Sequence, residues 1–421
     1  MQTSLYSSVF LRIFIPFGLA YFIGTLIGGA NAIMSPILID TFGLSPFNLG
    51  LMSSIYLIFF GITQIPVGVM LDRYGASKTL APLLLLAAVG AIIFSVSQGL
   101  TALFVSRMLL GIGLAGCLMA AFKGYADWID MERLPLAYSI QSLMGGLGGM
   151  IATRPLAIAF EMMNWRLIFA ILAVKLVIVA GMVFYMFPQK PIKNETKKIS
   201  IYRQFVEMIS FLGDRRFTAI APISIVSQGI LFAYMFLWLG PWLRDVALFT
   251  EEQTGLYLFY ASGGVAAGYF LNGVLADFFK RKGWLSWENL YLICGILTTL
   301  LLLFTVFGNP LISAILWPFI MFFSIMSMIA FPLLRNRFES DEVGRVFSLL
   351  NLAIFLMSFL LQWLIGAILE LYPVVDGHFS PAGYRMGLIV TVILSLASVV
   401  HFIYITRNGK LLLENGNVVK I

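Results

Sequence analysis

The sequence predicts an all-α membrane protein with twelve transmembrane helices in two pseudo-symmetric six-helix bundles. Three observations predict this fold class: an apolar composition, twelve apolar runs of membrane-spanning length, and a repeat of half the chain length. Of the 421 residues, 60% are hydrophobic and 11% are charged, whereas soluble proteins average ~45 to 50% apolar and ~25% charged residues. Because one membrane-spanning helix takes ~20 residues, such helices fill the chain, and its function must lie between them.

The predicted spans are apolar runs bounded by glycine, proline or charged residues. They fall at residues 11–39, 47–71, 79–98, 102–125, 136–160, 165–188, 217–240, 254–278, 288–308, 311–332, 345–371 and 384–406. The first run is too long for the apolar region of a signal peptide and lacks a small-residue cleavage site. We therefore expect it to be an uncleaved first helix.

Basic residues predict the orientation of the chain. With the N-terminus placed in the cytoplasm, 21 of the 27 Lys and Arg residues fall on the cytoplasmic side, three on the other side and three within spans. Cytoplasmic loops carry such an excess in membrane proteins. We expect both termini in the cytoplasm, and this topology accounts for the net charge of +7 without a nucleic-acid partner.

The longest polar stretch, residues 189–216, divides the chain near its middle. It predicts an N-terminal six-helix bundle over residues 1–188, a cytoplasmic linker, and a C-terminal six-helix bundle over residues 217–421. Within the linker, residues 201–212 place apolar side chains on one helical face. Two interpretations remain open for this segment, an amphipathic helix on the membrane surface and a solvated loop.

Corresponding loops of the two halves have similar sequences, at offsets of about 205 to 210 residues. One pair follows spans 2 and 8, and the other follows spans 4 and 10. A repeat of six-span units is typical of transporters. The polar and glycine residues that we select from these loops as gating candidates are Gly68, Asp72, Arg73, Gly75, Arg133, Asp277 and Arg345.

Three motifs resemble the major facilitator superfamily. The loop Gly-x-x-x-Asp-Arg-x-Gly at residues 68–75 is similar to the signature loop of that family, and Arg107-x-x-x-Gly111-x-Gly113 resembles its second motif. Asn164-Trp165-Arg166 opens span 6 as is common there. The resemblance covers the whole chain. It implies the major facilitator fold, a central cavity lined by spans 1, 4, 7 and 10, alternating access between the two halves, and no cofactor.

The signature loop suggests a latch between the halves. Gly68 is expected to let helices 2 and 11 approach closely, and Asp72 is expected to cap the N-terminus of helix 11 near Gly344. Spans 5 and 8 carry glycines at small-x-x-x-small spacing, for which the resemblance implies a seam between the halves and the alternative is packing within one half. These glycines are Gly145, Gly149, Gly264 and Gly268.

The charges predicted deep in the spans are all positive. Arg107, Arg154 and Lys175 lie there, whereas every Asp and Glu falls in a loop or near a span end. Arg107 and Arg154 share a depth of roughly 8 to 9 Å, at ~1.5 Å of rise per residue, so their guanidinium groups could clamp a carboxylate or phosphate. The alternatives are a structural or gating role for Arg107 and snorkelling of Arg154 to the surface. Lys175 is expected to have an internal structural role.

Uncharged polar and aromatic residues within spans are candidates to complete a substrate site. About half of such residues are expected to form interhelical hydrogen bonds or interface contacts instead. The candidates are Tyr21, Asn31, Gln141, Gln228, Tyr234, Trp238, Tyr260 and Asn351.

The same inventory argues against an enzyme or a metal site. Cys117 and Cys294 lie within apolar runs without metal-ligand spacing, and the two histidines, His378 and His401, lie far apart in sequence and form no Ser/His/Asp arrangement. The sequence therefore predicts a monomeric secondary transporter of the bacterial inner membrane that moves a small anionic organic solute, with protons or a counter-solute as coupling partner. The alternatives are an exporter of drugs or siderophore-like metabolites by proton antiport and a membrane receptor that does not transport.

Overall fold

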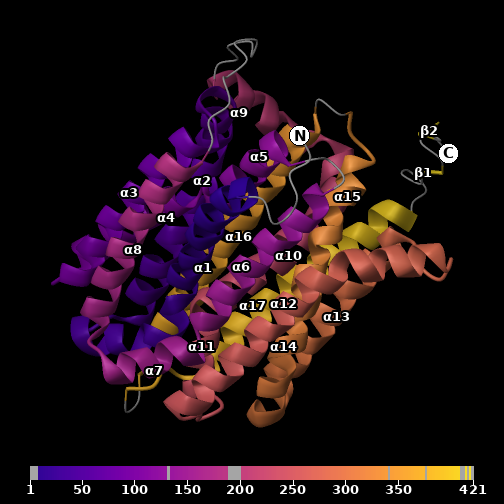
Figure 1. The fold of residues 1–421 in the computed structure, drawn as a ribbon. Helices are drawn as coiled ribbons and strands as arrows, with labels where there is room; N and C mark the ends of the chain where they lie inside the picture. Colours follow the sequence, from indigo (N-terminus) through magenta and orange to yellow (C-terminus); the bar gives the residue numbers. More distant parts are fainter. Residues whose placement is uncertain are drawn as a thin grey trace.

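The fold is a bundle of long helices that run in roughly one direction (Figure 1). The computed structural model describes residues 8–129, 133–187, 201–339, 342–374, 377–407, 413–414 and 417–418. The first part of the predicted linker lies outside these residues.

The N-terminal half consists of eight helices, because two of its predicted spans are each broken into two. The break between α4 and α5 falls at Ala115 and Gly116, and α6 and α7 meet at an angle of 47°. The helices are α1 (Ser8–Phe42), α2 (Pro46–Tyr74), α3 (Ala76–Val96), α4 (Leu100–Leu114), α5 (Cys117–Trp128), α6 (Leu134–Ile151), α7 (Arg154–Met162) and α8 (Trp165–Met186).

The C-terminal part begins with a short helix of the linker, α9, so that a helix forms where the sequence left helix and loop open. Its elements are α9 (Ile201–Ser210), η1 (Phe211–Gly213), α10 (Arg215–Ala233), the π-helix η2 (Tyr234–Trp238), α11 (Leu239–Asp245), α12 (Glu251–Arg281), α13 (Trp287–Phe307), α14 (Pro310–Met326), η3 (Ser327–Ile329), α15 (Ala330–Arg335), α16 (Val343–Glu370), α17 (Pro381–Arg407), β1 (Leu413–Glu414) and β2 (Asn417–Val418). The two strands pair antiparallel.

Length and apolarity alone identify ten membrane-spanning helices in the described part of the chain, or eleven when the bent pair α6 and α7 is one span. The helix α12 is not among them, although it is 31 residues long. It packs against α14, α6 and α7 within the bundle. The all-helical membrane fold is confirmed, and the count of twelve spans stays a prediction.

Local sequence sets several helix ends. Ser45, Asn164 and Asp214 accept hydrogen bonds from backbone N–H groups in the first turns of α2, α8 and α10, which satisfies donors that a helix leaves unpaired. Gly75 joins α2 to α3 with φ of +81°, a conformation that glycine adopts without a Cβ clash. The turn in the signature loop therefore requires this glycine.

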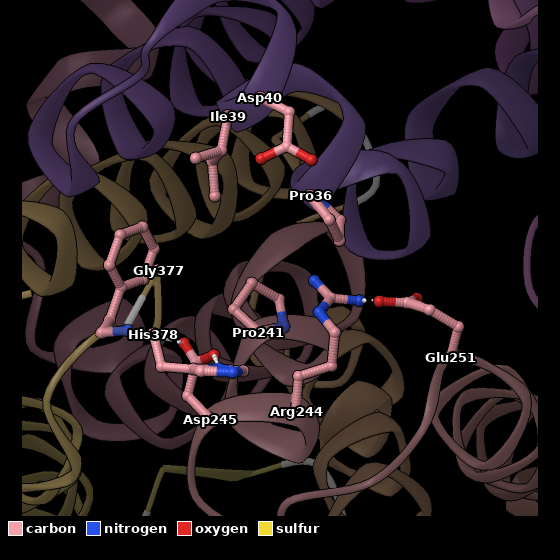
Figure 2. Close-up of a pocket in the computed structure, with 10 residues that line it drawn as sticks. Pro36, Ile39, Asp40, Pro241, Arg244, Asp245, Glu251, Gly377 and His378 are labelled. Atoms are coloured by element: carbon pink, nitrogen blue, oxygen red, sulfur yellow. Dashed lines mark hydrogen bonds and ion pairs between the residues drawn. The ribbon is translucent and has the colours of Figure 1, made fainter. Parts of the chain in front are cut away.

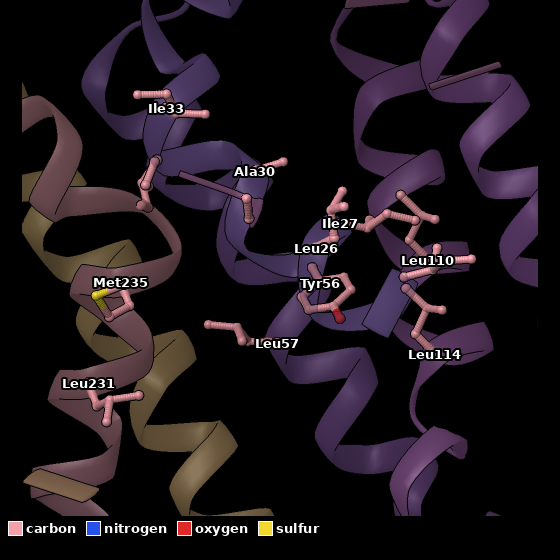
Figure 3. Packing of buried hydrophobic residues seen from close by; sticks show 14 of the residues in the cluster. Leu26, Ile27, Ala30, Ile33, Tyr56, Leu57, Leu110, Leu114, Leu231 and Met235 are labelled. Carbon is pink, nitrogen blue, oxygen red and sulfur yellow. The ribbon is translucent and has the colours of Figure 1, made fainter. Parts of the chain in front are cut away.

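The two ends of the bundle differ in what they carry. We call the end near α9 the linker end and the end near α7 and α11 the distal end (Figure 1). The halves meet along α2 and α16, and α12 packs across to α6 and α7. Figure 3 shows buried residues of α1, α2, α4, α10 and η2 that pack near this junction, with Leu57 of α2 pointing toward Leu231 and Met235.

The seam between spans 5 and 8 that the family resemblance implies is present, because α12 packs on α6 and α7, but Gly145 and Gly268 make their close contacts within one half. An added Cβ at Gly145 would meet the Tyr21 ring of the same half, and one at Gly268 would meet Ile325 and Phe322 of the same half. These glycines let α1 pack on α6 and α14 pack on α12, so the alternative of packing within one half is correct for them. Lys175 is exposed on α8, so its expected internal role is wrong.

Candidate functional site

Arg107 is the most unusual charged residue of the described chain. It lies on α4 with no exposed surface, and its guanidinium stands over the Phe94 ring at 4.3 Å from the ring centroid. Among the described residues, none accepts a hydrogen bond from its Nε, Nη1 or Nη2. A cation–π contact is worth about 2 kcal/mol or more when desolvated, but it leaves the five N–H donors unsatisfied. Such a group is costly in a bilayer unless an anion completes it.

Tyr56 connects the surroundings of Arg107 with the junction of the halves. Its hydroxyl lies within electrostatic range of the Arg107 guanidinium, and its ring faces Phe236 of η2 at 6.4 Å between centroids. One turn away on α2, Ser53 accepts a 3.0 Å hydrogen bond from Asn31, whose Oδ1 has no partner among the described residues. Asn31 and Tyr56 thus place polar atoms between α1, α2 and the C-terminal half.

The π-helix η2 carries two of the aromatic candidates. Trp238 donates its Nε1–H to the Gln362 carbonyl at 2.9 Å, and Tyr234 lies 3.4 Å from the Thr391 hydroxyl and against the Trp317 ring. Both are fully buried. Single-turn π-helices inside α-helices are frequent at functional sites, and here one joins α10 to α11.

The remaining polar candidates fall into two groups. Gln141 accepts from Tyr125 at 2.7 Å and donates to the Phe17 carbonyl at 3.1 Å, and Gln228 donates to Ser224 at 2.7 Å. Gln141 therefore joins α6 to α1 and α5, whereas the Gln228 bond lies within α10. By contrast, Tyr260 is 50% exposed on α12, Asn351 is half-buried on α16, and Tyr21 is half-buried against α6.

Arg154 has a carboxylate partner, contrary to the expectation of uncompensated positive charge. Its Nη2 lies 2.7 Å from Oε1 of Glu252, in the first turn of α12. The two residues belong to different halves, so this ion pair ties α7 to α12 at the distal end. The expectation that both arginines lack a carboxylate partner is therefore wrong for Arg154. It holds for Arg107 among the described residues.

Further contacts close the distal end between the halves. Arg244 of α11 donates to the Ser35 hydroxyl of α1, and the Phe47 N–H of α2 donates to Glu370 of α16 at 3.1 Å. An added Cβ at Gly240 would lie 2.7 Å from the Ala32 carbonyl carbon. Backbones of the two halves thus touch at this end, and glycine is what permits the contact.

The close approach of α2 and α16 is made at other glycines than Gly68. An added Cβ at Gly68 would meet only Met119 of the same half, whereas one at Gly50 would lie 2.8 Å from the Gln362 carbonyl oxygen and one at Gly61 would lie 2.7 Å from Phe355. The expectation for Gly68 is therefore wrong in this conformation. The reason is that the halves meet toward the distal end, whereas Gly68 lies toward the linker end.

The other gating candidates lie near the linker end. Asp72 pairs with Lys123 of its own half at 3.3 Å rather than capping α16. Arg345 pairs with Glu207 of α9 at 2.6 Å, which fastens the linker helix to α16. Arg73 and Arg133 are exposed, and the side chain of Asp277 lies outside the described part. The latch at Asp72 stays a prediction for a conformation in which the linker end is closed.

Sequence reasoning missed Ser35, Arg244, Glu252 and Glu370. Arg244 follows shortly after the predicted span at residues 217–240, and this place near a span end was the signal that the sequence offered for it. Nothing in the linear sequence connects the other three residues with partners in the opposite half.

Two halves of membrane-spanning helices that meet at one end are the architecture of a secondary transporter. The profile of the Major Facilitator Superfamily matches residues 17–362. The chain belongs to this superfamily, which is a family of multi-pass membrane transporters.

Relatives of known annotation are transporters. The probable sulfoacetate transporter SauU of Cupriavidus necator is 24% identical over 282 residues, which cover 63% of this chain and 64% of that protein. The nitrate/nitrite transporter NrtP of Nostoc punctiforme is 27% identical over 160 residues, which cover 34% of this chain and 32% of that protein. The matched region thus spans less than two thirds of the length of these relatives.

Solved structures share the fold at low sequence identity. A bacterial homologue of the human lysosomal transporter Spinster, in an inward-facing and unoccupied conformation, matches with a TM-score of 0.73 and 16% identity over 95% of this chain and 96% of that one. The nucleoside transporter NupG matches with a TM-score of 0.70 and 13% identity over 94% of this chain and 99% of that one.

Proposed function

We propose that this transporter moves a small anion by alternating access and that Arg107 binds the negative group of the substrate. The observation that carries the proposal is the buried Arg107 guanidinium, whose nitrogens have no hydrogen-bond partner among the described residues. A carboxylate, sulfonate or nitrate offers two oxygens to the planar fork of an arginine. The names of two relatives, a sulfoacetate and a nitrate/nitrite transporter, support an anionic substrate.

Alternating access follows from the covered position of Arg107. Its side chain has no exposed surface in the present conformation, so an anion reaches it only when the surrounding helices move apart. The distal end is held closed by contacts such as Arg244 with Ser35 and Arg154 with Glu252. With the distal end held closed, the path to Arg107 is proposed to open from the linker end, and the positive residues near that end support a cytoplasmic location for it.

Arg154 is proposed as a second anion contact only in the conformation in which the distal end opens. Its present partner Glu252 is a side chain with 73% exposure, and an exposed ion pair of this kind is worth only about 0.2 to 1 kcal/mol. Opening can therefore release Arg154 at low cost.

The test is a thermal-shift and calorimetric measurement on the purified protein with sulfoacetate, nitrate and, as a neutral solute, adenosine. At 100 times its dissociation constant a ligand stabilises the folded protein by about 2.7 kcal/mol. We expect stabilisation by an anion, weaker binding in Arg107→Lys because the fork is lost, and loss of binding in Arg107→Gln. Arg166→Gln is the matched control, because it removes an arginine of the same half that donates to the Ser95 and Ser97 carbonyls.

Two results would overturn the proposal. Affinity close to that of the natural protein in Arg107→Gln would make Arg107 a structural residue. Stabilisation by adenosine and by neither anion would favour a transporter of neutral solutes, which includes the drug-exporter alternative. Anion binding without uptake into vesicles would instead favour the receptor alternative.

A further inference from the structure

A small cavity of about 120 Å³ lies at the distal end where the two halves meet (Figure 2). Polar walls and this volume suit a few water molecules, whereas a large solute does not fit. Its lining comes from α1, α11, the start of α12 and the loop between α16 and α17. The lining residues are Pro36, Ile39, Asp40, Pro241, Arg244, Asp245, Glu251, Gly377, His378 and Phe379.

The charges around the cavity are unbalanced. Three carboxylates, Asp40, Asp245 and Glu251, share it with the single guanidinium of Arg244. Arg244 reaches Glu251 at 3.5 Å and bonds Ser35 of the other half. Among the described lining residues, negative charges therefore exceed positive ones by two while the His378 ring is neutral, and by one when the ring is protonated.

His378 is positioned to take up a proton. Its Nδ1 lies 2.8 Å from Oδ1 of Asp245, and 55% of its side chain is exposed, so solvent protons reach it. Asp245 is buried and accepts two further hydrogen bonds, from the Phe379 N–H at 3.3 Å and the Tyr384 hydroxyl at 2.7 Å. The Asp245 carboxylate is thus fixed in place. Protonation of the His378 ring makes its hydrogen bond to Asp245 charge-assisted and therefore stronger.

We propose that this cavity is a proton-binding site, with His378 as the proton acceptor, that couples closure of the distal end to proton uptake. Closure brings Asp40 of the N-terminal half to the same cavity as Asp245 and Glu251 of the C-terminal half, and like charges that approach each other oppose closure. Protonation of His378 offsets part of that repulsion. Opening of the distal end moves Asp40 away, so the protonated ring loses one of its neighbouring carboxylates.

Proton binding and closure must then promote each other. If the closed state binds the proton more tightly, thermodynamic linkage requires that a fall in pH favours the closed state. Histidine is the side chain that changes its charge between about pH 5 and pH 8 when free, so the test is made across that interval. The inference rests on the alternating access of the proposed function and is independent of the substrate.

The test measures the conformation of the full chain without substrate. Spin labels are placed at Met162, the last residue of α7, and at Leu371 after α16, both of them exposed residues of opposite halves, with Cys117 and Cys294 replaced by alanine. Pulsed EPR then gives the ratio of closed to open distances at the distal end. One proton changes this ratio by at most tenfold per pH unit, and we expect an increase of about threefold to tenfold from pH 8 to pH 5.5.

Three variants decide the assignment. In His378→Gln, which keeps a donor for Asp245 but does not titrate, we expect a ratio that no longer depends on pH. In Asp40→Asn, we expect a weaker pH response and a more closed distal end. The control is His401→Gln, the only other histidine of the sequence, which bonds the Thr218 carbonyl at 3.0 Å near the linker end; its pH response should equal that of the natural protein.

Three outcomes would overturn the proposal. These are a flat ratio in the natural protein, an unchanged pH response in His378→Gln, and loss of the response in Asp40→Asn alone, which would make a carboxylate the proton acceptor. A pH response in the natural protein without anion binding would leave the coupling intact and refute only the proposed substrate class. Anion binding with no pH response would do the reverse.

Discussion

Replacing Gly240 by alanine should open the distal end, because the backbones of the two halves touch there. An added Cβ at Gly240 would lie 2.7 Å from the Ala32 carbonyl carbon and 3.3 Å from its Cα, with the carbonyl oxygen closer still. Ordinary contacts of a Cβ begin near 3.4 Å, so α11 must move from α1 by more than half an ångström. Both contact atoms belong to backbone, which cannot rotate away as a side chain can.

The size of the effect follows from the cost of overpacking. Forcing one extra methyl group into a packed contact typically costs about 1 to 3 kcal/mol. Only the closed state has this contact, so the closed-to-open ratio should fall by about fivefold to 150-fold, at about tenfold for each 1.4 kcal/mol. The helix-forming advantage of alanine over glycine acts on both states and cancels.

The assay is the distance between spin labels at Met162 and Leu371. Gly263→Ala is the matched control, because Gly263 also lies in a helix of the C-terminal half and an added Cβ there has no atom within 4 Å. We expect the control to behave as the natural protein does and Gly240→Ala to show the longer distances. Equal distance distributions in both variants would refute the reasoning that the contact with Ala32 limits opening.

Three smaller effects follow from polar contacts. Reversing one charge of the Arg154 and Glu252 pair should favour the open distal end by less than about 1 kcal/mol. The double exchange Arg154→Glu with Glu252→Arg should restore the natural distance distribution between the spin labels. If it does not, the ion pair does not stabilise the closed distal end. Asp72→Asn should keep the fold but increase cysteine labelling at the linker end, because α16 loses a potential anionic cap in the conformation closed there; unchanged labelling would remove the latch. Burial raises the pKa of the Asp214 carboxyl, whereas the hydrogen bonds and the charge of Arg216 lower this pKa by a larger amount. The pKa of Asp214 therefore lies below its usual value. Asp214→Ala should therefore cost about 1 kcal/mol at neutral pH, and the stabilisation by Asp214 should vanish as pH falls below about 4; a melting temperature that is unchanged at pH 7 would contradict the capping role.

The sequence by itself determined the membrane class, the approximate spans and the family. Apolar run length is a local property, because each helix in a bilayer must satisfy its own backbone hydrogen bonds. The turn at Gly75 is equally local, since only the backbone angle at that residue requires glycine. The motif around Arg107 likewise identified the residue that proves to be buried and unpaired among the described residues.

Only the tertiary structure decided which residues meet across the halves. The sequence assigned the close approach of α2 and α16 to Gly68, whereas the structure makes it at Gly50 and Gly61. It left Arg154 unpaired, whereas Glu252 lies 98 residues away in sequence and 2.7 Å away in space. Helical periodicity states which face of a helix is apolar or small, but not which helix packs on it. In an alternating-access protein that partner also changes with conformation, so it is a property of the packed state rather than of any segment.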